Sequence, residues 1–301
     1  PDLIEDPGIF LSDVIVPILR QLTADSGDVR ESCAELIREY LKQLGTTRLA
    51  DTLTTISDAI FSRFGKNGES DESTVLVLLG ILLDLVTLVS ENTFPSVWDR
   101  YVPGTSFSVA CSLQLRDEDV KILACDLLIV MCTKSSDAAL SPVGELLIKA
   151  LIPNLRNRQR RVRKRVLEAL CDVLIKSSNT EHMEAISKYL QSLAEDHSNE
   201  VRLAVIEFVR KVLVEHPMRH TIYNPTMICL FYLLYPLIPI RETPFVKIVK
   251  DQRMMNEANK AFDALCAIGE QHELDNEEDF RQEGEFIDLT VFDEERVIPH
   301  G

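Results

Sequence analysis

The apolar residues of this 301-residue chain recur at helical spacing through most of its length. After Val29 they stand at positions 33, 36, 37, 40, 41 and 44, three or four residues apart, with polar residues between them. A shorter apolar segment from Pro17 comes before them, and a polar turn with Asp25 and Asp28 separates the two segments. The pattern predicts two helices joined by a turn, with their apolar faces toward each other.

The same helix–turn–helix pattern returns along the chain. Each copy opens its second helix with a valine, usually followed by a basic residue and preceded by an acidic turn. A further, degenerate copy ends near residues 258–269. A period near forty residues indicates a repeat protein, in which each helix pair buries its apolar face against its neighbours. The valines are Val29, Val75, Val120, Val162 and Val201, which are 46, 45, 42 and 39 residues apart.

This repeat resembles the HEAT family, whose armadillo-like units are two antiparallel helices. The resemblance is carried by the Val-Arg dipeptide, by the Asp in the turn, and by Pro17 and Pro153 in first helices. It implies an all-α, right-handed α-solenoid of about six HEAT repeats with one continuous core. We expect the solenoid to cover residues 1–269 and an acidic C-terminal extension to cover 270–301. The expected units are roughly residues 9–45, 48–91, 95–133, 142–177, 180–215 and 220–269.

The HEAT resemblance also implies structural roles for the charged residues at the turns. The turn Asp is expected to cap the second helix, and the Val-Arg arginine to pair with an Asp of the adjoining unit. The structural repeat positions are Asp28, Arg30, Asp117, Lys121, Arg163, Asp196 and Arg202.

Composition agrees with packed helices, since apolar residues make up 46% of the chain and Trp98 is its one tryptophan. The two longest apolar runs, residues 75–89 and 227–240, are short and are interrupted by Asp84 or by prolines. We therefore expect buried helices there, and neither a membrane span nor a signal peptide.

The cysteines predict a reducing compartment. No two of them have CxxC spacing, and most fall on apolar helical faces, which favours buried thiols over metal ligands or disulfides. A cytoplasmic location is therefore expected. The seven are Cys33, Cys111, Cys125, Cys132, Cys171, Cys229 and Cys266.

One segment, RNRQRRVRKR at residues 156–165, is strongly basic in a chain of net charge −16. Val162 and Val166 continue an apolar stripe, so the segment is expected to form a turn and the start of a second helix. Arg163 is the structural arginine of the repeat, and this turn lacks the usual Asp. Basic residues at a helix N-terminus oppose the helix dipole, so they suggest a partner. The candidate contact residues are Arg156, Arg158, Arg160, Arg161, Lys164 and Arg165.

Three interpretations of this basic segment stay open: a solvated turn, a contact with an acidic protein or with the chain's own acidic tail, and a nucleic-acid site. The negative balance of the chain disfavours nucleic acid. Twelve acidic and two basic residues from Glu270 onward give that tail a net charge of −10. Its apolar cluster is expected to pack along the solenoid rather than form a disordered motif. The cluster consists of Phe286, Ile287, Leu289, Val291 and Phe292.

The chain lacks the catalytic and nucleotide-binding motifs GxxxxGK, GxGxxG, HExxH and GxSxG. His216 and His220 have the spacing of a helical metal pair, but Pro217 lies between them and favours a loop or a cap. We therefore expect no catalytic residue, no cofactor, no metal site and no enzymatic activity.

The last unit, ALCAIGEQHELDNEEDF, and the connector reaching EERVIPHG resemble the dynein axonemal assembly factor 5 family of long HEAT arrays. Val297 follows Arg296 where that family is expected to have a proline. The resemblance implies a protein-binding scaffold for cytoplasmic preassembly of axonemal dynein arms, with dynein chains and chaperones as partners.

Two other functions remain alternatives to an assembly scaffold. An importin-like transport receptor, or a general HEAT adaptor, would be favoured by a row of acids along the inner helices. A HEAT-type DNA glycosylase would be favoured by Trp98 lying in a basic groove. The acids expected in the importin-like row are Glu31, Glu35, Asp126 and Glu207.

Overall fold

The computed structural model describes residues 11–44, 49–65, 68–88, 96–177, 182–194, 196–215 and 260. Within these ranges the chain consists of helices and short connections, with no strand. The chain divides into two compact units, residues 1–182 and 183–301.

The described residues of the first unit form four helix pairs and five shorter helices. The first helices of the pairs are α2 (Val16–Gln21), α4 (Leu49–Phe61), α7 (Val102–Ser112) and α10 (Gly144–Leu151). The second helices are α3 (Gly27–Leu44), α5 (Glu72–Leu88), α8 (Glu118–Lys134) and α11 (Arg160–Ser177). The shorter ones are the π-helix η1 (Leu11–Ile15), α6 (Ser96–Asp99), α9 (Asp137–Leu140), and the 3-10 helices η3 (Ser141–Val143) and η4 (Ile152–Arg156).

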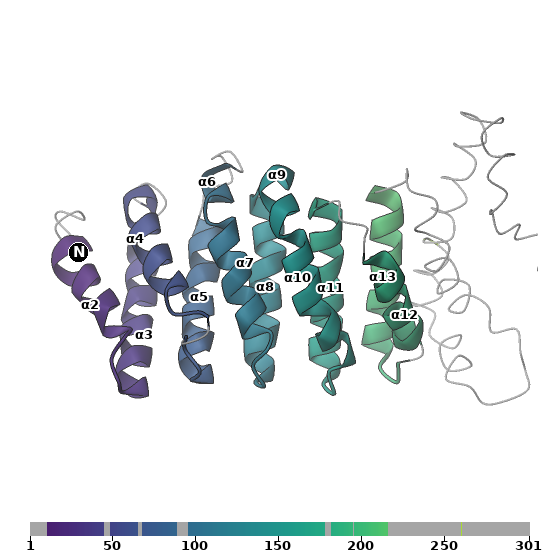
Figure 1. Ribbon diagram of the computed structural model, residues 1–301, viewed down its shortest axis with the longest axis horizontal. Helices are drawn as coiled ribbons and strands as arrows, with labels where there is room; N and C mark the ends of the chain where they lie inside the picture. Colours follow the sequence, from purple (N-terminus) through teal and green to yellow (C-terminus); the bar gives the residue numbers. More distant parts are fainter. Residues whose placement is uncertain are drawn as a thin grey trace, which may run out of the picture. The chain divides into compact units, whose positions relative to one another are not determined.

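The helices of the first unit form two layers (Figure 1). In one layer α3 packs on α5, α5 on α8 and α8 on α11, and in the other α2, α4, α7 and α10 follow one another. The core lies between the layers. Each helix pair therefore completes the burial of its neighbour, and the predicted all-α solenoid is confirmed.

The central helix α5 illustrates why the layers stay together. Its sequence is apolar on almost every side, and both neighbouring second helices and the first-helix layer pack on it. Burying one such leucine contributes about 1.5–3 kcal/mol. The buried residues of α5 are Thr74, Val75, Leu78, Leu79, Gly80, Ile81, Leu82, Leu85 and Val86.

In the second unit, α12 (Met183–Ala194) packs against α13 (Asn199–Glu215). Ile186 and Leu190 of α12 are buried, as are Val205 and Val209 of α13. Several predictions lie outside the described residues: the sixth unit at 220–269, the pair His216 and His220, the extension at 270–301, and its apolar cluster at 286–292.

The repeat register predicted for α5 is wrong by one residue. The amide of Val75 donates to the Asp71 carbonyl, as that of Lys121 does to the Asp117 carbonyl at the start of α8. Val75 therefore occupies the position of the basic residue, and Thr74 that of the repeat valine. Both residues are 1% exposed, so two buried residues are accommodated at these positions, and the Thr74 hydroxyl donates to the carboxylate of Asp71.

The stretch Asp137–Arg156 has the length and composition of a membrane-crossing helix. In the structure it is divided into α9, η3, α10 and η4, and Pro142 and Pro153 stand at two of the junctions. Helix α10 packs on α7 and α11, with Leu147 and Leu151 fully buried. These features are typical of a core helix.

The cysteines follow the prediction in part. Cys125, Cys132 and Cys171 are buried free thiols, whereas Cys33 and Cys111 are partly exposed. Burial raises the pKa of Cys132 to about 12, with a smaller contribution from the charge of Asp172. The other two cysteines of the chain, at positions 229 and 266, lie outside the described residues.

Candidate functional site

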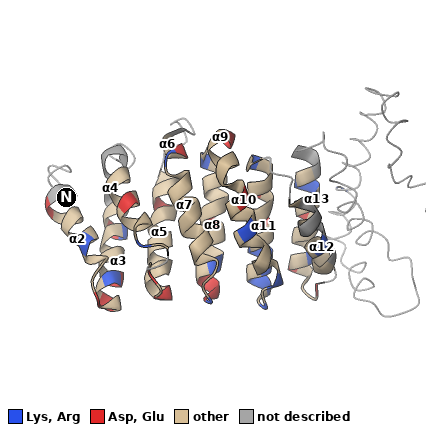
Figure 2. Ribbon diagram, in the orientation of Figure 1, with Lys and Arg blue, Asp and Glu red and all other residues tan. Residues whose placement is uncertain are grey.

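Basic residues gather where η4 ends and α11 begins (Figure 2). Arg156 ends η4, Arg158 lies in the turn, and Arg160 and Arg161 open α11. All four are exposed, and half-buried Lys164 follows one turn later, 3.8 Å from Glu168. We call these five basic residues the basic edge.

Three arginines of the basic edge are available to a partner. The side chains of Arg158, Arg160 and Arg161 make no hydrogen bond or ion pair within the described part of the chain. Arginine presents five donors in a planar fork that matches carboxylates. This group can therefore bind acidic side chains without first breaking an internal contact.

Arg165, the sixth predicted contact residue, is engaged within the fold. Its guanidinium donates to Asp126 of α8 and to Glu168 of its own helix. Burial disfavours the charged form, but the bonds to the two carboxylates outweigh that effect and raise the pKa of Arg165 above its ordinary value. Arg165 thus ties α11 to α8.

Arg163 holds the turn that displays the basic edge. Its Nη1 donates to the carbonyls of Asn157 and Arg158, each at 2.8 Å. Arg30 makes the same contacts in the first pair, at 2.8 Å to Ala24 and 3.0 Å to Asp25. In the second unit Arg202 donates to the carbonyl of Asp196. The arginine of the Val-Arg dipeptide therefore closes its own turn.

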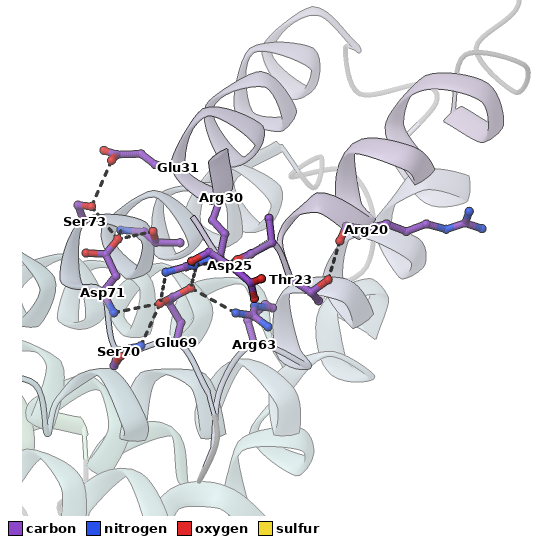
Figure 3. A network of polar contacts seen from close by, with 12 residues as sticks. Arg20, Thr23, Asp25, Arg30, Glu31, Arg63, Glu69, Ser70, Asp71 and Ser73 are labelled. Atoms are coloured by element: carbon purple, nitrogen blue, oxygen red, sulfur yellow. Dashed lines mark hydrogen bonds and ion pairs between the residues drawn. The ribbon is translucent and has the colours of Figure 1, made fainter. Parts of the chain in front are cut away.

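The expected pairing of this arginine with an Asp of the adjoining unit is wrong for Arg30, which pairs with Glu69. Arg30 Nε lies 2.6 Å from Glu69 Oε2, and Arg63 also donates to that carboxylate (Figure 3). Glu69 Oε1 further accepts from the amides of Ser70 and Asp71. The side chain of a Glu is longer than that of an Asp, so Glu69 can reach Arg30 in the turn of the first helix pair. The Glu69 amide meanwhile donates to the Arg63 carbonyl within the turn of the second pair.

The turn aspartates divide between capping and other roles. Asp117 Oδ1 accepts from the Val120 amide at 2.8 Å and caps α8, as predicted. Asp196 Oδ1 instead accepts from the Ser198 amide, so it shapes the turn before α13. Asp28 lies exposed in the first turn of α3, whose first intrahelical bond runs from Arg30 to the Ser26 carbonyl.

Asn154 was missed by the sequence reasoning. Lys121 Nζ donates to its Oδ1 at 2.6 Å, and its Nδ2 donates to the carbonyls of Leu113 and Ala150. This buried amide joins the third helix pair to the fourth. A single polar residue inside the apolar run ALIPNL was the signal that could have identified it.

The basic edge departs from the charge at the other second-helix N-termini. The first turns of α3, α5, α8 and α13 carry acidic residues, whereas that of α11 has none. Positive side chains beside the N-terminal dipole cost about 0.3–1 kcal/mol each. The side chains of Arg158, Arg160 and Arg161 make no contact within the described residues that would offset this cost, which favours a role in recognition.

The features that would have favoured the alternatives are incomplete. Trp98 is fully buried against Tyr101, their ring centroids 5.1 Å apart, so it does not line a basic groove. In the acidic row, Gly80 takes the place between Glu35 and Asp126, and Asp126 is bonded to Arg165. Among the described residues no group of His, Cys, Asp and Glu could hold a metal ion.

The sequence matches, over residues 5–283, the family described as dynein axonemal assembly factor 5-like, TPR repeats. A comparison with curated proteins gave no match.

Solved structures of designed repeat proteins share the fold. A designed armadillo repeat protein in complex with the peptide (KR)4 is 12% identical, with a TM-score of 0.57 over 83% of this chain and 99% of that one. Computationally designed armadillo repeat proteins for modular peptide recognition give 13% identity, a TM-score of 0.57 and the same coverage. At this identity the likeness concerns the fold alone.

Proposed function

The chain belongs to the dynein axonemal assembly factor 5-like family, and we propose that it is a non-catalytic scaffold that binds proteins during cytoplasmic preassembly of axonemal dynein arms. Dynein chains and chaperones are the proposed partners. The repeat architecture supports this proposal, because a row of rigid helices offers a long surface with many independent contact points.

The basic edge carries the proposal at the level of residues. Arg163 holds a turn in place, and three exposed arginines lie in this turn or in the first residues of the helix that follows it. Holding the turn lowers the entropy lost when a partner binds. The partner surface that fits is acidic and offers carboxylates to the guanidinium groups.

The absence of enzymatic activity is part of the same proposal. The catalytic motifs are missing from the sequence, and the buried position of Trp98 removes the feature that favoured a DNA glycosylase. Some of the charged groups that contact one another, such as Arg165 with Asp126, join neighbouring helices.

An affinity pull-down from the cytosol of ciliated cells tests the proposal. The wild type is compared with a variant in which Arg158, Arg160 and Arg161 are changed to Ser. A control variant changes Arg20, Lys149 and Lys188 to Ser, which removes the same charge from exposed positions elsewhere.

The proposal expects the wild type and the control to recover dynein chains and chaperones, and the basic-edge variant to recover much less. Equal recovery by all three proteins would make the basic edge a solvated turn and leave the scaffold function intact. Recovery of nuclear-transport cargo without dynein chains would overturn the assembly function.

A further inference from the structure

At four equivalent positions the second helices α5 and α8 carry seven apolar residues and Asp84, whereas α3 carries only polar residues there, and α11 carries three polar residues and the buried Cys171. To align the four helices, we count from the residue whose carbonyl accepts the first intrahelical hydrogen bond. This residue is Ser26 for α3, Asp71 for α5, Asp117 for α8 and Gln159 for α11. The compared positions are the fifth, sixth, twelfth and thirteenth residues after it. These are Leu76, Val77, Leu83 and Asp84 in α5, and Ile122, Leu123, Ile129 and Val130 in α8. They are Glu31, Ser32, Arg38 and Glu39 in α3, and Lys164, Arg165, Cys171 and Asp172 in α11.

These positions lie on one face of the second-helix layer, as the contacts between neighbouring helices establish. Arg38 Nε of α3 lies 2.7 Å from Asp84 Oδ2 of α5, both from the compared positions. Arg165 of α11 bonds Asp126 of α8 on the same face. Because α5 packs directly on α8, their apolar residues lie side by side, and they flank a central row in which the Arg38 guanidinium lies over Gly80 and Asp126 is bonded to Arg165. We call these seven residues, without Asp84, the apolar strip.

The apolar strip is not required by the core. All seven side chains are half-buried, whereas the core-facing residues of the same helices, such as Leu79 and Leu128, are fully buried. The corresponding positions of α3 are polar and its helix still packs on α5. Partly solvated apolar residues that the neighbouring helix replaces with polar ones favour a protein-binding surface.

The charges beside the apolar strip indicate what the partner carries. On the α11 side, Arg165 is bonded to both Asp126 and Glu168, so that region is internally paired. On the α3 side, Arg38 is paired with Asp84, while exposed Glu35 makes no ion pair within the described residues. Glu31 lies one helical turn from Glu35, and among the described residues its carboxylate accepts one hydrogen bond, from the Ser73 hydroxyl. The flank toward α3 is therefore acidic.

We propose that the apolar strip binds an amphipathic helix of a partner protein, with basic residues on the side that faces Glu31 and Glu35. Neighbouring helices of a layer lie about 10 Å apart, close to the roughly 10 Å that separates residues i and i+7 of a helix. A helix lying across α5 and α8 thus places apolar residues at that spacing on both, and its next two turns reach α3. This proposal rests on the scaffold function proposed above and names the chemistry of one partner.

Labelled peptides of about 20 residues test it by fluorescence anisotropy. The first peptide is an amphipathic helix with leucines on one face and lysines at one end. The second replaces those lysines with glutamates, and the third replaces the leucines with serines. The full chain is compared with the variant Leu83→Gln/Ile129→Gln and with Glu35→Lys. The matched control is Phe107→Gln/Leu146→Gln, which removes apolar residues that are 45% and 42% exposed on the first-helix layer.

We expect the lysine peptide to bind at least about tenfold more tightly than either other peptide. Leu83→Gln/Ile129→Gln should weaken its binding about tenfold, and the control less than about twofold, with circular dichroism establishing that both remain helical. Glu35→Lys should weaken binding and reduce its dependence on salt. Leu83 and Ile129 are half-buried, so their substitution can also disturb the packing of α5 and α8. Glu35 is exposed, so Glu35→Lys tests the site without changing the apolar packing.

Equal binding of the lysine and glutamate peptides would overturn the predicted partner charge. Failure of the lysine peptide to bind, or equal weakening by the control, would overturn the assignment of the site. Either result, together with recovery of dynein chains in the pull-down, would refute the apolar strip while leaving the scaffold function standing.

Discussion

Arg30 and Glu69 form a nearly buried ion pair that joins the turns of the first two helix pairs. Their atoms Nε and Oε2 lie 2.6 Å apart, and the side chains are 13% and 3% exposed. Arg30 also closes its own turn, and Glu69 accepts from two amides of the next. One pair therefore fixes two turns at once.

Glu69→Ala should destabilise the first unit by about 3 kcal/mol, because it leaves Arg30 and two amides without their acceptor in a buried place. Urea unfolding followed by the fluorescence of Trp98, the single and fully buried tryptophan, measures this loss. Glu118→Ala, at an exposed position, should change stability by less than about 0.5 kcal/mol. Similar losses from both changes would contradict the importance of the pair.

The same carboxylate should make stability depend on pH. Burial raises the pKa of Glu69, but the Asp71 amide and Arg30 outweigh that effect and hold the pKa below its ordinary value. A depressed folded-state pKa contributes stability that is present above the unfolded pKa of about 4.3 and is lost as pH falls through the folded value. Urea unfolding between about pH 6 and pH 3 should show a shallower acid loss for Glu69→Gln than for the wild type. Identical pH profiles of stability for the wild type and Glu69→Gln would contradict this role of Glu69.

Arg160 and Arg163 lie one helical turn apart in α11, and replacing them with Ala should change the stability by different amounts. Arg163→Ala removes two bonds from a charged donor to turn carbonyls and should cost about 2 kcal/mol. Arg160→Ala should stay within about 0.5 kcal/mol, since its exposed side chain has no partner among the described residues. Thermal unfolding compares the two, and a larger loss for Arg160→Ala would mean that the basic edge is structural.

Gln159→Asp should stabilise the protein and weaken its binding of an acidic partner. Gln159 accepts the first intrahelical bond of α11, so an Asp there can cap the helix and oppose the clustered positive charge, gaining about 1 kcal/mol. Gln159→Asn is the matched control, since it can cap without adding charge. Thermal unfolding measures the stability, and the dynein pull-down measures the binding. Equal binding by Gln159→Asp and Gln159→Asn would mean that the charge of the basic edge does not contribute to partner binding.

Two helical glycines should respond oppositely to alanine. A Cβ at Gly104 of α7 would lie 2.5 Å from the ring of Phe61, so Gly104→Ala should cost about 1–3 kcal/mol. A Cβ at Gly80 of α5 meets only the guanidinium of Arg38 at 3.2 Å, on a flexible side chain that is 40% exposed. Gly80→Ala should therefore cost less than about 0.5 kcal/mol or stabilise the helix. Urea unfolding distinguishes these results, and equal losses would contradict the packing.

Helical periodicity was sufficient to predict the fold, because stacking imposes the same apolar spacing on every unit. The register of α5 escaped prediction because Thr74 and Val75 are both buried, so the pattern around them does not mark which one begins the repeat. Local sequence also identified the basic segment.

The roles of the individual arginines in that segment depended on distant residues. Arg165 is engaged by Asp126, which lies 39 residues earlier on another helix, and no feature of the segment itself points to it. The apolar strip escaped for a related reason. Its residues in α5 and α8 resemble core residues until the neighbouring helices show which face remains in contact with water.

The arginine that closes the turn, such as Arg163, separates the shape of the turn from the side chains that the turn displays. It lies inside its helix and grips the main chain of the turn, whatever side chains that turn displays. Substitutions at positions such as 158 and 160 therefore leave the turn's shape intact. A repeat that has this arginine can acquire or lose a charge on its edge without a change in the turn that displays it.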